Sequence, residues 1–255
     1  MPFRGAAPDR DSDVLAHYSW YDAAVWRADV PAVDYCWPPL LDQLPVASTV
    51  RGRDWRKVSR ADVFSLAASA TTPQRMVQLL VAAIVWGVGN SVQGRRRHLK
   101  FLEQPAANHS LAKLGRRLVS AVELARSESP ISAYAALHGC ESGEGSLNVP
   151  HLGPSYGTKL LYFSSYSSSL ESATPALILD QRVATALSWL TGAAWERQPE
   201  GWSAARYEEY LRLASNWAGQ WPTEPDCVER VLFAIGKSQE LAVRSFVEPS
   251  ASSSC

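Results

Sequence analysis

The chain has 255 residues, of which 46% are hydrophobic and 20% charged, a mixture that can bury the core of one large domain or two small ones. Its 25 basic and 25 acidic residues give a formal net charge of zero. Any contact with nucleic acid must therefore come from local basic clusters and not from overall charge. The most apolar run, residues 79–88, is too short to cross a bilayer, which argues against a membrane role.

The spacing of the cysteines and histidines limits which metal cofactors the chain could bind. The four cysteines are far apart and form no CxxC pair, which argues against a zinc ribbon or an iron–sulfur cluster. The five histidines show no metal-binding spacing either, so we expect no cofactor. The first residues, Met1-Pro2-Phe3-Arg4, lack an apolar signal core, so we expect a cytoplasmic protein with reduced thiols.

The predicted elements are nearly all helices. Asp11-Ser12-Asp13 is expected to cap a helix that continues to about Ala24, and the prolines of residues 30–48 indicate an ordered loop. Gly87-Val88-Gly89 is typical of a helix end and not of a phosphate loop, because no strand precedes it. Start signals and apolar spacing predict further helices at residues 60–70, 74–86, 111–126, 130–137, 180–191, 203–218 and 225–241.

Little of the chain has the pattern of a strand. Period-2 alternation is almost absent, and only residues 176–179 are plausible as a strand. We therefore predict a mainly α fold with little or no sheet. The chain is divided into an N-terminal arm packed on the body (1–50), a helical domain (51–245) and a disordered tail (246–255).

One stretch organises the helical domain. Residues 151–159 read His-Leu-Gly-Pro-Ser-Tyr-Gly-Thr-Lys, and their two glycines and one proline predict a tight turn, after which Thr158 and Lys159 start a helix. Asp180 closes the apolar run 175–179 and stands where an N-cap carboxylate belongs. Taken singly, such a lysine is usually a solvated charge and such an aspartate only a cap, but the pair at this spacing favours a catalytic interpretation.

This layout resembles the helix-hairpin-helix DNA glycosylase superfamily, most closely its 8-oxoguanine DNA glycosylase-like branch. The resembling residues are Gly153-Pro154, Gly157-Thr158-Lys159 and Asp180, with an interval of 180 − 159 = 21 residues between lysine and aspartate. The resemblance implies a helical glycosylase-like fold with its hairpin at 151–159. It also implies that Lys159 is a Schiff-base nucleophile, and that Asp180 activates it or stabilises the sugar cation.

The sequence departs from the branch in three respects. Leu-Gly-Pro-Ser-Tyr-Gly replaces the usual Leu-Pro-Gly-Val-Gly of the hairpin, so the geometry of the turn is open. Nothing near the N-terminus looks like the β-rich domain of the eukaryotic enzymes. The cysteine cluster of the endonuclease-type branches is missing.

The remaining candidates would contact DNA. A hairpin of this family grips a phosphate beside the flipped-out nucleotide through backbone N–H groups. The candidates for DNA binding are Gly153, Tyr156, Gly157, Thr158, His151, Arg95, Arg96 and Arg97. His151 either touches phosphate or merely packs, and the arginines either contact the DNA backbone or form a solvated face. The candidates for the base pocket, or otherwise for the core, are Tyr162 and Trp189.

The resemblance implies a DNA glycosylase that acts as a monomer on double-stranded DNA containing a modified or damaged base and leaves an abasic site. One candidate substrate is glucosylated hydroxymethylcytosine of phage DNA, removed as antiviral defence, because the branch includes bacterial proteins of that kind. The other is 8-oxoguanine, excised in repair with AP lyase activity. Two other classes stay open: a non-catalytic DNA-binding module, and a helical protein-interaction domain.

Overall fold

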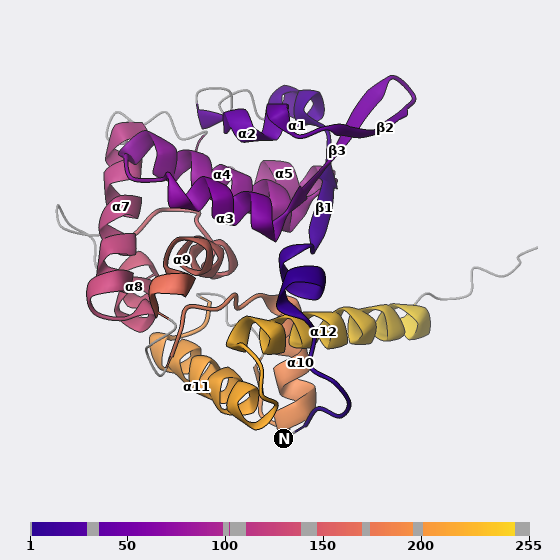
Figure 1. Ribbon diagram of the computed structural model, residues 1–255, viewed down its shortest axis with the longest axis vertical. Coiled ribbons are helices and arrows are strands. Elements are labelled where there is room, and N and C mark those ends of the chain that lie inside the picture. Colours follow the sequence, from indigo (N-terminus) through magenta and orange to yellow (C-terminus); the bar gives the residue numbers. More distant parts are fainter. Residues whose placement is uncertain are drawn as a thin grey trace, which may run out of the picture.

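Helices dominate the chain, and one of them, α9 (Pro154–Ser169), lies in the middle of the others (Figure 1). The computed structural model describes residues 2–29, 36–98, 102, 111–138, 147–169, 174–195 and 201–247. The prediction of a mainly α fold with little sheet is confirmed. No helix in these ranges is long and apolar enough to cross a membrane.

A small antiparallel sheet near the N-terminus was not predicted. Its strands are β1 (Tyr18–Tyr21), β2 (Val46–Val50) and β3 (Arg53–Ser59), in the order β1-β3-β2. Arg51 and Gly52 connect β2 to β3 with φ values of 53° and 71°, as a tight two-residue hairpin turn requires. The boundary that we placed at residues 50 and 51 falls within this hairpin.

The single helix predicted from Asp11 to Ala24 is wrong. The segment instead forms one π-helical turn, η1 (Arg10–Leu15), then strand β1, then helix α1 (Ala23–Asp29). β1 pairs along its whole length with β3, more than thirty residues later, and a local pattern contains no trace of such a partner. A short helix, α2 (Pro39–Gln43), lies within the proline-rich segment, of which residues 30–35 are outside the described part.

Helix α4 (Pro73–Val88) forms the apolar centre of the upper half of the molecule in Figure 1. Residues 79–86 are all buried, as expected for a helix that is apolar nearly all round. Thr72 caps its start, with Pro73 in the first turn, and Gly89 ends it with φ 58°. The preceding helix α3 (Arg60–Ala68) starts at Ser59, whose side chain forms a capping box with Asp62.

The remaining helices complete the fold, and two of them make the main further contacts with α9. Most of the predicted starts are confirmed, with Asp180 capping α10 and Ser203 capping α11; the expected start at residues 108–110 lies outside the described residues. These helices are α5 (Val92–His98), α7 (Leu111–Ser127), α8 (Pro130–His138), α10 (Gln181–Thr191), α11 (Ala204–Gln220) and α12 (Pro225–Val247). Helix α12 extends past the predicted end at 241, and residues 248–255 of the predicted tail are outside the described part.

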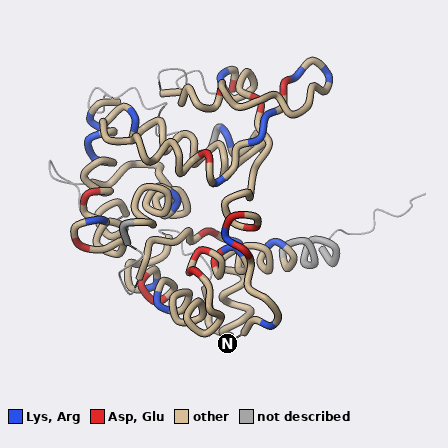
Figure 2. The backbone as a smooth tube through the Cα atoms, viewed as in Figure 1, with Lys and Arg blue, Asp and Glu red and all other residues tan. Residues whose placement is uncertain are grey.

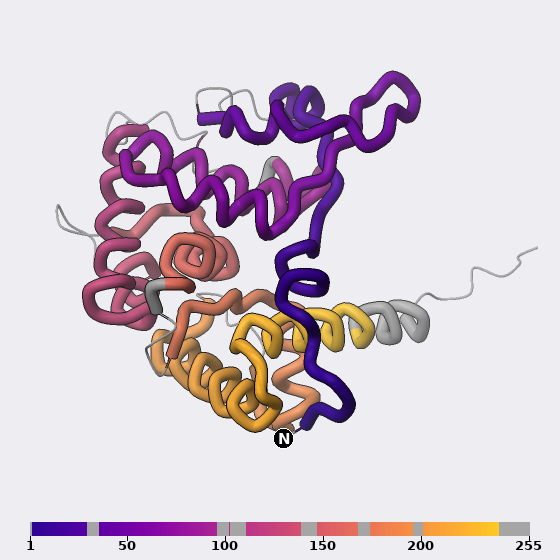
Figure 3. The backbone as a smooth tube through the Cα atoms, in the orientation of Figure 1, coloured from indigo at the N-terminus to yellow at the C-terminus, as the bar shows by residue number. Residues whose placement is uncertain are grey.

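The start of the chain returns to its last helix. Figure 3 shows the N-terminal segment running beside the first turns of α12. Arg10 of η1 joins the two, because its Nε lies 3.0 Å from Asp226 Oδ2 and 3.0 Å from Glu224 Oε2. Arg10 thus ties η1 to the start of α12.

Candidate active site

The turn before Lys159 is shorter than predicted. Helix α9 already begins at Pro154, so Thr158 and Lys159 lie in its second turn and do not start it. Proline fits the first helical position, since its φ is preset and its missing N–H is not needed there. The positive φ of the turn falls on His151, at 67°, and not on Gly153.

This earlier start corrects the predicted phosphate grip. The backbone N–H groups of Tyr156 and Gly157 donate to the carbonyl of Gly153, at 2.9 and 3.2 Å, so both are used inside the helix. Gly157 has a packing role, because a Cβ built on it would lie 2.1 Å from Nε2 of His138. Only His151 and Gly153 of the predicted grip remain in the turn that precedes the helix.

The predicted strand at residues 176–179 is extended and buried, but it joins no sheet. Side chains satisfy its backbone instead. Tyr207 donates its hydroxyl to Leu177 O at 2.9 Å, and Tyr210 donates to Ile178 O at 2.9 Å. Thr158 of α9 accepts the N–H of Leu179 at 3.1 Å. Thr158, a predicted DNA-binding residue, is fully buried, and its hydrogen bond with Leu179 joins this segment to α9.

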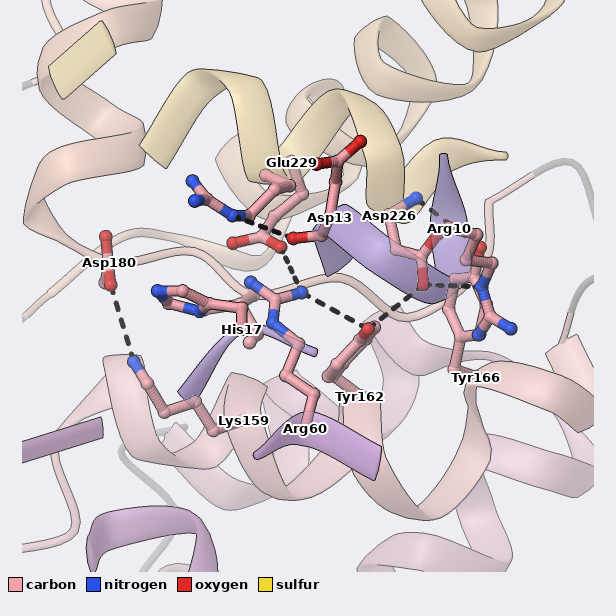
Figure 4. Close-up of polar contacts among 12 residues, drawn as sticks. Arg10, Asp13, His17, Arg60, Lys159, Tyr162, Tyr166, Asp180, Asp226 and Glu229 are labelled. Atoms are coloured by element: carbon pink, nitrogen blue, oxygen red, sulfur yellow. Dashed lines mark hydrogen bonds and ion pairs between the residues drawn. The ribbon is translucent and has the colours of Figure 1, made fainter. Parts of the chain in front are cut away.

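That fastening places Asp180 opposite Lys159. One oxygen of Asp180, Oδ1, accepts the N–H groups of Arg182 at 3.0 Å and Val183 at 3.1 Å, which caps α10. The other oxygen, Oδ2, lies 3.5 Å from Lys159 Nζ, and Figure 4 shows the two side chains pointing toward one another. The structure therefore brings together the two residues that the sequence singled out.

Lys159 is a buried amine, with 4% of its surface exposed. Its Nζ donates to Ser155 O at 3.4 Å and lies 5.1 Å from the centroid of the Tyr156 ring. Burial lowers the pKa of Lys159 below its ordinary value, while the facing Asp180 carboxylate opposes that shift. A lowered pKa raises the fraction of neutral amine, the form that acts as a nucleophile.

Gly87 marks where solvent comes close to this amine. It is exposed at the end of α4, yet a Cβ built on it would lie 2.9 Å from Lys159 Cε and 3.4 Å from Tyr156 Cε1. A glycine here leaves the aliphatic part of the lysine free to reach its position. In the sequence pattern Gly87 is only part of a helix end.

A buried ion pair lies near Lys159, and the sequence did not predict it. Glu229 of α12 and Arg60 of α3 are both fully buried, with Glu229 Oε2 2.6 Å from Arg60 Nη1 (Figure 4). Burial raises the pKa of Glu229, although Arg60 opposes the shift. The guanidinium of Arg60 also lies over the Trp86 ring, 4.9 Å from its centroid. The two residues lie in helices at opposite ends of the sequence, so no local pattern links them.

The ion pair continues to the protein surface through Tyr162. Arg60 Nη1 donates to the Tyr162 hydroxyl at 3.2 Å, and that hydroxyl donates to Asp226 Oδ2 at 3.0 Å. Arg10, partly exposed, contacts the same carboxylate. Tyr162 is itself fully buried and belongs to this internal chain of hydrogen bonds, which agrees with the alternative that placed it in the core. Trp189, the other candidate for the base pocket, lies on α10 with 62% of its surface exposed.

His17 is a neutral polar group in the same region. It lies between η1 and β1, and its carbonyl accepts hydrogen bonds from Arg60 N and Trp86 Nε1, each at 3.0 Å. Burial, with a further contribution from the Arg60 cation, lowers the pKa of His17 to about 3. Within the described residues its Nδ1 is buried without a hydrogen-bond partner. The imidazole is therefore uncharged at neutral pH.

Of the predicted basic cluster Arg95–Arg97, the structure describes the side chain of Arg95. Arg95 has 3% of its surface exposed and forms an ion pair with Asp29, with Nε 2.7 Å from Oδ2. It also donates to Asn90 O at 3.1 Å. Arg95 therefore ties α5 to α1, which leaves little of its side chain exposed for the predicted DNA contact. The side chains of Arg96 and Arg97 lie outside the described part of the structure.

The helical scaffold around a buried lysine that faces a helix-capping aspartate defines the class as DNA glycosylase-like. The family described as "Putative 8-oxoguanine DNA glycosylase OGG-like protein" matches residues 12–233. The chain belongs to that family. The matched residues include both Lys159 and Asp180, and the family implies DNA as the substrate. No curated protein and no solved structure matches the chain. Among the described residues, no group of three or more His, Cys, Asp or Glu side chains is placed to hold a metal ion.

Proposed function

We propose that this protein is a DNA glycosylase in which Lys159 attacks the sugar of an extruded nucleotide and Asp180 assists. The observation that supports it is the approach of the buried Lys159 amine to Asp180 Oδ2, at 3.5 Å, in a chain of the OGG-like family. Burial favours the neutral, nucleophilic amine, and the capping bonds keep the carboxylate fixed beside it.

The proposed reaction begins with a base turned out of the duplex. The lone pair of Lys159 Nζ forms a bond to C1′ while the C1′–N bond breaks and its electron pair leaves with the base. Nζ loses a proton, which Asp180 accepts and the departing base receives. The positive charge that develops on the sugar lies near the Asp180 carboxylate, which lowers the barrier. Opening of the sugar ring then gives a Schiff base at Lys159, and water hydrolyses it to an abasic site.

The turn that precedes α9 is the proposed phosphate contact. His151 and Gly153 lie in it, immediately before the helix that holds Lys159. A phosphate bound there would put the neighbouring sugar close to the amine, without reading the base sequence. The chain would act on double-stranded DNA as a monomer.

Two modified bases are the candidate substrates. The family description favours an oxidised purine such as 8-oxoguanine, with strand cleavage after base removal as an added step. The second is glucosylated hydroxymethylcytosine of phage DNA, which would make the protein an antiviral enzyme. The lack of a β-rich N-terminal domain and the unusual hairpin favoured this second candidate from sequence, and the small N-terminal sheet weakens the first of these two reasons. Incubation with an 8-oxoguanine duplex and with DNA of a T-even-type phage, followed by an assay for abasic sites, separates the two.

Borohydride trapping tests the reaction itself. Reduction of the Schiff base links the wild-type protein covalently to DNA, and Lys159→Gln abolishes the link. Lys237→Gln on α12, a change at an exposed lysine, serves as the matched control and keeps trapping at the wild-type level. Trapping by the Lys159→Gln variant at the wild-type rate would contradict the proposal. A non-catalytic DNA-binding module would show binding without trapping in any variant.

A further inference from the structure

The β2–β3 hairpin projects from the helical body and is strongly basic. It extends beyond the packed helices at the upper right of Figure 1, and Figure 2 shows Lys and Arg residues toward its tip. Residues 46–57 contain four basic side chains and one acidic side chain, 4 − 1 = 3 positive charges in a chain whose net charge is zero. The positive charge is therefore concentrated on an element that stands away from the core.

The charges at the tip have no ion-pair partner in the part of the chain that the structure describes. Arg51 and Arg53 are exposed, and neither forms an ion pair within the described ranges. Arg56, nearer the body, donates instead to the carbonyl of Leu44. The one acidic residue, Asp54, accepts the hydroxyl of Thr49 at 2.9 Å. Folding thus explains Arg56 and Asp54, but it leaves the two tip arginines without an internal role.

Exposed aromatic rings lie at the base of the same sheet. Tyr18 and Trp20 alternate along β1, so they share a face, with 43% and 37% of their surfaces exposed. Lys57 of β3 is the cross-strand partner of Trp20. Its Nζ lies 4.2 Å from the Tyr18 ring centroid and 4.7 Å from that of Trp20. This face combines flat apolar rings with a cation, a combination that binds the bases and phosphates of nucleic acid.

Strand β1 adjoins the end of α4 that borders Lys159 through its backbone and Ser19, while its aromatic face is turned away from that helix. A Cβ on Gly89 would lie 3.3 Å from the carbonyl oxygen of Trp20, while one on Gly87 would lie 2.9 Å from Lys159 Cε. Only two residues of one helix end therefore separate the strand that carries the rings from the reactive amine. DNA held at Lys159 would extend along this sheet.

We propose that the β2–β3 hairpin and the exposed face of β1 form a second DNA contact, which grips the duplex beside the extruded nucleotide. Arg51 and Arg53 pair with phosphates, and Trp20 and Tyr18 pack against the bases or sugars next to them. A two-stranded β-ribbon has the width to enter a major groove. The inference rests on the proposed function only in taking DNA as the partner.

The test compares variants of matched charge. Arg51→Asn with Arg53→Gln removes both tip charges, and asparagine is well tolerated at the positive φ of residue 51. Arg4→Gln with Arg212→Gln removes two exposed charges near the N-terminus and on α11, away from the sheet. Affinity for a labelled duplex with a tetrahydrofuran abasic site is measured by fluorescence anisotropy at several NaCl concentrations.

The hairpin variant should bind about ten-fold more weakly than wild type. The slope of log affinity against log salt concentration should become less steep by about 1 to 2, because each lost phosphate contact removes roughly 0.9 from it. Trp20→Ala should also weaken binding about ten-fold, but with the salt dependence unchanged, since stacking releases no counterions. The Arg4/Arg212 variant should match wild type. Hairpin and control variants that bind alike would overturn the inference, even if wild type is trapped by borohydride. If wild type is not trapped by borohydride but the hairpin variant still binds DNA more weakly than wild type, only the proposed chemistry is refuted.

Discussion

Asp180 uses its two carboxylate oxygens for different partners: Oδ1 caps α10, and Oδ2 faces Lys159 Nζ at 3.5 Å. The cap fixes the rotation of the carboxylate, because two backbone N–H groups hold one of its oxygens. The residue that starts the helix is thus also the one that directs a negative charge at the amine.

Asp180→Asn separates these two roles. Asparagine caps helices about as well as aspartate, so the melting temperature should change little. The charge is lost, and we expect base release in single turnover to fall about 10²–10³-fold, the range seen when a group that stabilises charge in the transition state is removed. Because the carboxylate raises the pKa of Lys159, its removal should also move the rising limb of the pH–rate profile to lower pH. An unchanged rate and profile would rule out a catalytic role for Asp180.

Lys159→Met should stabilise the protein while abolishing base release. The pKa of Lys159 is lowered on folding, so the unfolded state binds the proton more tightly. The cost of burying the charge is full below the folded-state pKa and disappears above the unfolded-state pKa. At neutral pH we expect a gain on the order of 1 kcal/mol, a rise of about 2–4 °C in melting temperature, which shrinks as the pH is raised. A variant less stable than wild type at neutral pH would contradict this.

Gly87→Ala should impair the reaction more than the fold. The added Cβ would come within 2.9 Å of Lys159 Cε, and because that atom lies near the end of a flexible side chain, the amine moves and the backbone stays. We expect base release to fall about ten-fold or more, since small displacements of a reacting group are costly, with a minor change in melting temperature. Gly219→Ala on α11 is the matched control, because its Cβ would meet nothing within 4 Å. Equal activity of both variants would show that Gly87 has no influence on the lysine.

Arg60 and Glu229 should behave as a coupled pair in equilibrium unfolding. Glu229→Ala leaves a buried guanidinium without its carboxylate and should cost about 3–5 kcal/mol. Replacing both with apolar residues, Arg60→Met with Glu229→Leu, removes both charges and should be less destabilising than the single change. Urea denaturation of Arg60→Met, Glu229→Leu and the double variant measures the coupling. Additive losses would mean that the two charges do not depend on one another.

The parts of the fold that could be predicted from sequence are those with local causes. Ser59, Asp180 and Ser203 each precede an apolar helical pattern, and each caps a helix in the structure. The pairing of Lys159 with Asp180 came from a family resemblance, since spacing alone does not show that two side chains meet. The hydrogen bond from Leu179 N to Thr158 brings Lys159 and Asp180 together, and no local sequence pattern predicts that bond.

The parts that could not be predicted depend on distant partners or on competing signals. Strand β1 exists because β3 pairs with it, and Arg60 is buried as a charge only because Glu229 arrives from the last helix. At the start of α9, the glycines suggested a longer turn, while Pro154 as first residue favoured an earlier helix, and the proline prevailed. The positive φ fell on His151 and not on a glycine, although histidine is one of the non-glycine residues enriched at positive φ.

The contacts that hold Asp180 in place come from Thr158, Tyr207 and Tyr210, all in helices outside the β1–β3 sheet. Substitutions in the hairpin loop therefore leave the spacing of amine and acid untouched. Changes along that loop would therefore alter the proposed DNA contact while the reaction centre keeps its geometry.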